Sequence, residues 1–244
     1  MIRVKTIMIN GKEVPVTGES VDQAINSIIF KDWLASLNRL FVIKSIHFQS
    51  VDISPRTSRV KFIKAKIELI DCDGSKFTNI IFMRGGAVTI LFVIHVDKEE
   101  FTILTRQPRL PSGSFRLLET PAGTIDTSET AVKVAVREIW EEVGIKIREN
   151  QLIDLTAHFH EKRHKGIYTS PGACDEFLRI FLCEITMTDG ELEQLRGKLT
   201  GLRDEGERIT LEVFRLRELP FEAPDAKSLA ALALYDAYIR EHST

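Results

Sequence analysis

The segment from Gly123 to Ile145 constrains the fold of this chain more than any other part of the sequence. Apolar residues recur in it at helical spacing, namely Val132, Val136, Ile139 and Val143. This pattern predicts a helix over residues 128–143 that packs one apolar stripe against a sheet. Asp126 and Glu129 precede the stripe with the spacing of a helix cap and its reciprocal carboxylate.

Three glutamates lie along one flank of this predicted helix. Glu138 and Glu142 are four residues apart, about 6 Å along a helix axis, and Glu141 lies one step round from them. Like charges this close raise one another's pKa or destabilise the helix unless a countercharge binds. Mg²⁺ or Mn²⁺ would supply that charge, and two or three such ions could neutralise a diphosphate and activate a water. Arg137, four residues before Glu141, could orient its carboxylate.

A run of charges is more often a solvated helix flank with ordinary salt bridges. The fixed positions of the segment argue against that interpretation here. They match G-x5-E-x7-R-E-U-x-E-E-x-G-U, where U is aliphatic, and average residue usage gives a chance match on the order of one in a billion at any start. This pattern is the Nudix box, and the segment resembles the Nudix hydrolases.

The resemblance extends over about residues 20–240. It is carried by "NSIIFKDWLASL", "RGGAV", "TRQPRLPSG", "ETPAGTID", "YTSPGACDEF", "LRGKLTGLRDEGERITLEVF" and "DAKSLAALALYDAYIRE". Together these stretches resemble the ADP-sugar diphosphatases of plants and, more loosely, bacterial ADP-ribose pyrophosphatases. The resemblance implies an α/β (α+β) Nudix sandwich with a mixed β-sheet between helices. It also implies a homodimer, in which a smaller β-rich N-terminal domain over residues 1–85 helps to build the partner's substrate site beside the Nudix domain over 86–244.

The same resemblance assigns roles to individual residues. It implies metal binding by Glu138, Glu141, Glu142 and the main-chain carbonyl of Ala122. It implies catalytic roles for Glu141, Glu142 and a glutamate of the loop "GLRDEGERI", which is Glu205 or Glu207, with Glu205 favoured. It implies substrate contacts by Arg84, Arg109 and Pro171.

The position of Pro171 leaves the preferred sugar open. The proline in "SPG" resembles one that marks the ADP-sugar branch, but "FHEKRHKGIYT" lengthens the loop before it relative to the bacterial enzymes, as in the plant-type group. A loop proline is equally often an ordinary turn residue.

The remaining elements are predicted from periodicity and turn signals. A helix is expected from Ser20 through Trp33, half-exposed strands from residue 46 to residue 83 with a turn at "DCDGS", and a bulge between Phe62 and Ile63. Beyond a boundary at Arg84–Gly86, a buried hairpin is expected from Ala87 to Thr105. Further strands are expected near 152–160, 176–185 and 208–216, and further helices near 190–199 and 225–241.

Composition limits the function classes. A net charge of -2 provides no basic field for nucleic acid, and three cysteines without a C-x-x-C pair indicate a reducing compartment. "GGAVTILFVIHV" is too short to span a membrane and the first residues lack a signal-peptide pattern, so we expect a cytoplasmic protein without membrane contact. His158, His160 and His164 are spaced so that they could bind zinc, but their polar surroundings favour an exposed loop.

We therefore expect hydrolysis of ADP-ribose or ADP-glucose to AMP and a sugar phosphate. One alternative keeps the fold and metals but takes a UDP-sugar or another nucleoside diphosphate derivative as substrate. Another is a non-catalytic Nudix domain that senses a nucleotide, although such a domain should have lost glutamates of the box and this chain has all of them.

Overall fold

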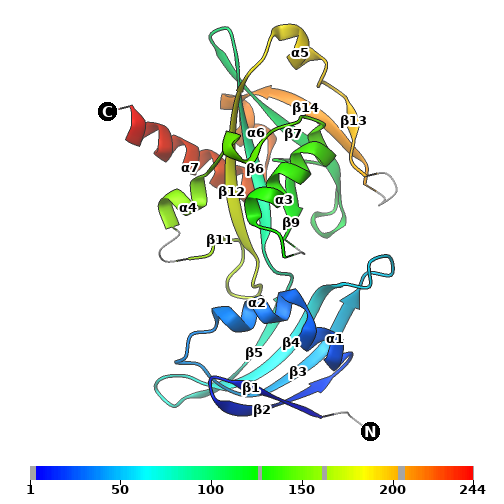
Figure 1. Cartoon of the computed structure of the whole chain (residues 1–244), viewed down its shortest axis with the longest axis vertical. Coiled ribbons are helices and arrows are strands. Elements are labelled where there is room, and N and C mark those ends of the chain that lie inside the picture. The colour runs from blue at the N-terminus through cyan, green and yellow to red at the C-terminus, as the bar shows by residue number, and fades with distance from the viewer. Residues whose placement is uncertain (1–3, 126–127, 161–163, 203–206, 244) are drawn as a thin grey trace. The chain divides into compact units, whose positions relative to one another are not determined.

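The computed structural model describes residues 4–125, 128–160, 164–202 and 207–243, which form two compact units (Figure 1). One unit comprises Met1–Gly86 and Tyr168–Phe177, and the other comprises Ala87–Ile167 and Leu178–Thr244. Residues 168–177 pack with the N-terminal part, which the predicted boundary at Arg84–Gly86 does not include. A parallel bridge between Phe82 and Cys174 makes that connection, with the N–H of Phe82 donating to the carbonyl of Ala173 at 2.8 Å.

The N-terminal unit is a five-stranded sheet whose strands lie in chain order. The strands are β1 (Lys5–Ile9), β2 (Lys12–Gly18), β3 (Val42–Ile53), β4 (Val60–Ile70) and β5 (Lys76–Met83). Only β2 and β3 pair in parallel. Helices α1 (Val21–Asn26) and α2 (Ile28–Ser36) pack on one face of this sheet (Figure 1). Phe30 and Trp33 of α2 join Phe48 of β3 in the core between them.

The single helix predicted after Ser20 is wrong, because the chain breaks at Ser27. Ser27 has extended backbone angles, φ −66° and ψ 151°, and its side-chain oxygen accepts from the N–H of Phe30 at 3.1 Å. A serine that caps a new helix in this way competes with continuation of the helix before it.

The hairpins of this sheet follow the sequence in part. The turn predicted at residues 71–75 is confirmed, with the N–H of Ser75 donating to Asp71 Oδ1 at 2.9 Å between β4 and β5. The bulge predicted between Phe62 and Ile63 is wrong. Those residues pair in unbroken register with Asp52 and Val51 of β3. The nearest register shift of this strand pair lies between Asp52 and Ile53 on β3.

The second unit contains a mixed nine-stranded sheet. Its central strands are β6 (Ala87–Val96), β7 (Glu99–Arg109), β12 (Phe177–Thr186) and β14 (Ile209–Arg215). Its shorter strands are β8 (Ser114–Glu119), β9 (Ala122–Thr124), β10 (Leu152–Asp154), β11 (Ile167–Tyr168) and β13 (Leu199–Thr200). The strand order is β10-β12-β6-β7-β14-β13, in which β11 pairs with β12, β8 with β7 and β9 with β6. The helices are α3 (Ala131–Glu138), α4 (Leu155–His160), α5 (Asp189–Glu193), α6 (Leu219–Glu222) and α7 (Ala226–His242).

Strand β6 is buried on both of its faces, as expected for a sheet that lies between helices. Ile90 and Phe92 belong to the core cluster that includes residues of α3, whereas Leu91 and Val93 belong to the cluster that includes residues of α7. Figure 1 labels β6 and both helices. Because successive side chains of a strand point to opposite faces, a strand covered on both faces must be almost wholly apolar. The predicted mixed sheet between helices, with an additional β-rich N-terminal region, is confirmed.

Most predicted elements of this unit are present, with two corrections. The hairpin of β6 and β7, strands β12 and β14, and helix α7 lie where they were predicted. The strand predicted over 152–160 ends at Asp154, and the chain continues as α4, so His158 and His160 lie on a helix rather than in an exposed loop. The helix predicted over 190–199 ends at Glu193, and its last position, Leu199, begins β13. In the described part of the chain, no helix has the length and apolar character needed to cross a membrane.

Candidate active site

The helix that carries the three glutamates is shorter than predicted and ends in a π-turn. Helix α3 begins at Ala131 with Thr130 in the cap position, so the predicted cap at Asp126 is wrong, and Asp126 itself lies outside the described residues. A π-helical turn follows over Ile139–Val143 and ends at Gly144, whose φ of 77° suits glycine.

The buried stripe of this helix also differs from the prediction. Ile139 and Val143 are buried as expected, but Val134 and Ala135 fill the adjoining positions, and Val136 is only half buried. The correction matters because the buried side of the helix now includes the positions of Glu138 and Glu142. Both carboxylates are therefore enclosed and not displayed on a solvated flank.

The π-helical turn is held by hydrogen bonds from Thr200 and Gly201. The hydroxyl of Thr200 donates to the carbonyl oxygen of Glu142 at 2.5 Å, and the N–H of Gly201 donates to that of Glu141 at 3.2 Å. These bonds satisfy carbonyls that a helix end leaves without partners. They also place the start of the loop that carries Glu205 and Glu207 beside the glutamates of the box.

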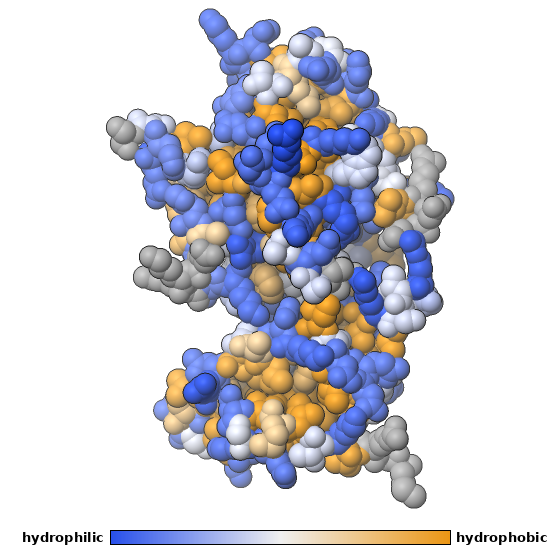
Figure 2. Space-filling model, viewed as in Figure 1, coloured by the Kyte–Doolittle hydropathy of each residue, from blue (hydrophilic) through white to orange (hydrophobic). Residues whose placement is uncertain are grey.

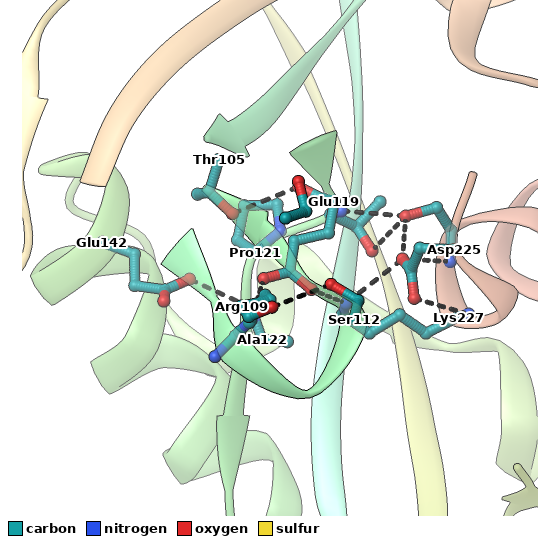
Figure 3. A network of polar contacts seen from close by, with 12 residues as sticks. Thr105, Arg109, Ser112, Glu119, Pro121, Ala122, Glu142, Asp225 and Lys227 are labelled. Carbon is teal, nitrogen blue, oxygen red and sulfur yellow. Dashed lines mark hydrogen bonds and ion pairs between the residues drawn. The ribbon is translucent and has the colours of Figure 1, made fainter. Parts of the chain in front are cut away.

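Glu142 is directed at the first residue of β9. It is 4% exposed, and its Oε2 accepts a hydrogen bond from the N–H of Ala122 at 3.0 Å (Figure 3). The next residue, Gly123, lies so close to Glu138 that a Cβ atom there would overlap the carboxyl group. The main chain of Ala122 and Gly123, at the start of β9, therefore lies directly against both carboxylates, and we call these two residues the floor of the site.

The pKa of Glu142 is raised to about 8, chiefly by burial and then by the charge of Glu138. The hydrogen bond from Ala122 lowers the pKa in part, and the charges of Glu207 and Glu119 contribute smaller increases to the same total. A carboxylate in such surroundings is costly to ionise unless a cation neutralises it. The structure thus provides a physical reason for a cation at this position.

The oxygen atoms present fit a hard divalent cation. Two buried carboxylates and the adjoining main chain supply only oxygen donors, which Mg²⁺ accepts while it keeps several waters. Within the described ranges, no group of three or more histidine, cysteine, aspartate or glutamate side chains is already clustered as a metal cage. Glu205 lies outside those ranges.

Arg137 holds the other glutamates of the flank. Its Nη1 lies 3.1 Å from Glu141 Oε2 and 3.0 Å from Glu138 Oε1, so the contact predicted between Arg137 and Glu141 is present. The side chain of Glu141 is more accessible than that of Glu142. The three glutamates therefore differ in environment, and Glu142 is the most enclosed.

Of the two loop glutamates, the structure describes one. Glu207 Oε2 accepts from the N–H of Leu202 at 2.9 Å, and its charge contributes to the raised pKa of Glu142. The favoured residue, Glu205, lies outside the described residues.

Arg109, at the end of β7, is held by a buried acid that the sequence analysis missed. Arg109 Nε donates to Glu119 Oε1 at 2.6 Å, and Glu119 also pairs with Lys227 of α7 (Figure 3). Only the position of Glu119, three residues before Ala122, hinted at a role. Its second partner is 108 residues away, so no local pattern links them.

Arg84 and Pro171 belong to the N-terminal unit. Arg84 Nη1 lies 3.1 Å from Glu176 Oε1, and the N–H of Arg84 donates to Asp175 Oδ1 at 2.8 Å. Pro171 is exposed within the turn in which Cys174 N–H donates to the carbonyl of Ser170 at 2.9 Å. The structure thus brings Arg84 and the "SPG" turn into one unit, while all the box glutamates lie in the other.

The helix that ends in enclosed glutamates and packs on a mixed sheet is the arrangement expected of a Nudix domain. The profile described as NUDIX domain matches residues 83–232. The chain belongs to the NUDIX family, whose hydrolases generally use divalent metals such as Mg²⁺.

Two relatives and one solved structure show which members of the family this chain is similar to. The chain is 36% identical to "Nudix hydrolase 14, chloroplastic" of Arabidopsis thaliana over 236 residues, which cover 93% of this chain and 75% of the relative. It is 28% identical to the "ADP-ribose pyrophosphatase" of Bacillus subtilis (strain 168) over 64% of this chain and 77% of the relative. The crystal structure of an ADP compounds hydrolase shares the fold, with a TM-score of 0.54 and 19% identity over 85% of this chain and 98% of that chain.

Proposed function

We propose that this protein hydrolyses the diphosphate bond of an ADP-sugar, ADP-ribose or ADP-glucose, to give AMP and a sugar phosphate. The observation that carries the proposal is the pair of buried carboxylates, Glu138 and Glu142, on the floor made by Ala122 and Gly123. The names of the relative from Bacillus subtilis and of the structural neighbour support an adenine nucleotide as part of the substrate.

Mg²⁺ would be held by Glu138, Glu142 and the carbonyl of Ala122, with Glu141 in support, and Mn²⁺ is an alternative. We propose two to three ions, which would neutralise the diphosphate and lower the pKa of a bound water. The side chains then have separate tasks. Arg109 binds the diphosphate through its guanidinium, and a loop glutamate, Glu205 or Glu207, accepts the proton of the attacking water.

The N-terminal unit is proposed to bind the substrate through Arg84 and Pro171 and to form a homodimer. Its surface displays apolar side chains (Figure 2). Met8, Ile80 and Phe82 are exposed apolar residues of this unit, and Ile80 is 53% exposed. Phe82 stacks on Phe62 with ring centroids 5.3 Å apart. An apolar surface on so small a sheet is stabilised when a second copy covers it.

The test is a screen of nucleoside diphosphate derivatives with Mg²⁺, with both products identified by chromatography. The proposal expects ADP-ribose or ADP-glucose to give AMP and ribose 5-phosphate or glucose 1-phosphate. A preference of tenfold or more for UDP-glucose, about 1.4 kcal/mol in transition-state terms, would contradict the adenine assignment. Binding without hydrolysis of any compound would favour a sensor instead.

A further inference from the structure

Glu119 is a buried carboxylate that lies between two cations. Its side chain is 4% exposed, its Oε1 accepts from Arg109 Nε at 2.6 Å, and its other oxygen pairs with the ammonium group of Lys227. Lys227 also lies 3.1 Å from Asp225 Oδ2. A carboxylate enclosed to this degree needs charged partners on both oxygens, and here it has them.

A second, uncharged connection fixes the same point of the chain to α7. Ser228 Oγ donates to Asp225 Oδ2 at 2.6 Å and accepts from the N–H of Thr120 at 2.9 Å. Asp225 itself caps α7 by accepting from the N–H groups of Lys227 and Ser228. The end of β8 is therefore attached to the start of α7 through two adjacent residues, Glu119 and Thr120. Figure 3 labels Glu119 and its partner Lys227.

The guanidinium of Arg109 is bound to Glu119 through Nε, while the side chain as a whole remains partly exposed. Its side chain is 41% exposed although its partner is almost fully buried. Counting only the residues that the structure describes, Nη1 and Nη2 of Arg109 make no hydrogen bond or ion pair. A guanidinium clamped through Nε presents its two amino groups as a fork of fixed direction, which suits the oxygens of a phosphate.

This fork and the buried glutamates share one short stretch of chain. Glu119 is three residues before Ala122, whose N–H donates to Glu142. The stretch from β8 to β9 thus carries both the anchor of an arginine suited to an anion and the floor of a site suited to cations. A metal-bound diphosphate needs both.

We propose that Glu119 is a positioning residue which, held by Lys227, aims Arg109 at the diphosphate of the substrate. The inference rests on the proposed function and extends it to a residue that does not touch the substrate. Clamping the arginine in advance reduces the side-chain ordering that binding would otherwise require.

Steady-state kinetics on ADP-ribose with saturating Mg²⁺ tests the proposal through a double-mutant cycle. Glu119→Gln should raise KM about tenfold while kcat changes less than about threefold, because the lost interaction binds substrate and transition state alike. In an Arg109→Ala background the same change should move KM less than about twofold, since nothing is left to position. Glu99→Gln breaks an exposed ion pair with Arg215, 3.1 Å apart at the other end of β7, and should leave KM unchanged. A KM rise of equal size in both backgrounds, or no rise in either, would overturn the proposal.

A second measurement does not depend on turnover. Hydrogen exchange of the Arg109 Nε–H, assigned by its absence in Arg109→Ala and followed by NMR on the full chain, should speed up at least about tenfold in Glu119→Gln. Equal exchange rates in the two proteins would show that Glu119 does not hold the arginine. If the wild-type chain hydrolyses no ADP-sugar, the proposed function fails, and this exchange experiment still decides whether Glu119 fixes Arg109.

Discussion

The N–H of Ala122 donates to Glu142 Oε2 over 3.0 Å and joins the first residue of β9 to the most enclosed glutamate of the box. This bond stabilises the ionised form of Glu142, but burial outweighs it and the pKa still rises to about 8. Without a cation, ionisation of Glu142 in the folded protein is therefore unfavourable. Metal binding, folding stability and pH should be linked through this one carboxyl group.

Metal-free protein should lose stability as the pH rises from about 4.5 to about 8. Glu142 ionises near 4.5 in the unfolded chain and near 8 in the folded one, so between these values the folded state binds more protons, and raising the pH favours unfolding. Thermal unfolding in EDTA across this range measures the effect. Glu142→Gln removes the titrating group, so its profile should fall less steeply, and Mg²⁺ should restore the wild-type protein at pH 8. Parallel profiles for the two proteins would contradict this assignment.

Glu142→Gln should keep the fold and lower kcat with Mg²⁺ by about a hundredfold or more, which equals about 3 kcal/mol of transition-state stabilisation. The substitution keeps the side-chain volume but removes the charged oxygen proposed to hold the metal. Circular dichroism beside steady-state rates checks both statements. Glu193→Gln, at an exposed glutamate paired only with Arg196 among the described residues, is the matched control. Near-normal turnover of the Glu142 variant would remove that residue from the metal site.

Gly123→Ala should raise the Mg²⁺ concentration for half-maximal activity about tenfold. The new methyl group would overlap the Glu138 carboxyl, and because that carboxyl ends a flexible side chain, it can move away while the fold persists. The displaced carboxyl would no longer lie on the floor of the site. Gly190→Ala, where the methyl group meets open space, should leave the metal requirement unchanged. Measuring rates against Mg²⁺ concentration compares the two, and equal curves would show that Glu138 does not need its present position.

The parts of the site that the sequence could predict are those with short spacing. Arg137 and Glu141 are one helical turn apart, so their contact follows from periodicity. The contact of Ala122 with Glu142 spans 20 residues and that of Glu119 with Lys227 spans 108, and both depend on how strands and helices pack. The break at Ser27 was equally hidden, because a serine within an apolar helical pattern can continue a helix or cap the next one.

Ile80→Lys should convert a dimer into a monomer. Ile80 is exposed on β5, and a charge in the apolar surface it shares with Phe82 would have to be desolvated on association. Light scattering at micromolar concentration should give twice the chain mass for the wild type and the chain mass for the variant. Phe221→Lys, at an apolar residue exposed on the other unit, should remain dimeric. A monomeric wild-type chain would remove the dimer from the proposed function.

A glutamate of the loop after Gly201 is the proposed base. Glu205→Gln should lower kcat about a hundredfold or more with little change in KM, because the lost proton acceptor acts in the transition state and not in binding. Glu207→Gln is the matched comparison, since Glu207 lies near Glu142 and its carboxylate accepts the N–H of Leu202. If Glu207 is the base, Glu207→Gln should lower kcat and Glu205→Gln should not. If both variants retain near-normal kcat, neither glutamate accepts the proton. Hydrolysis in ¹⁸O-labelled water shows which phosphorus is attacked, because one product must carry the label. Label in neither product would contradict hydrolysis at the diphosphate.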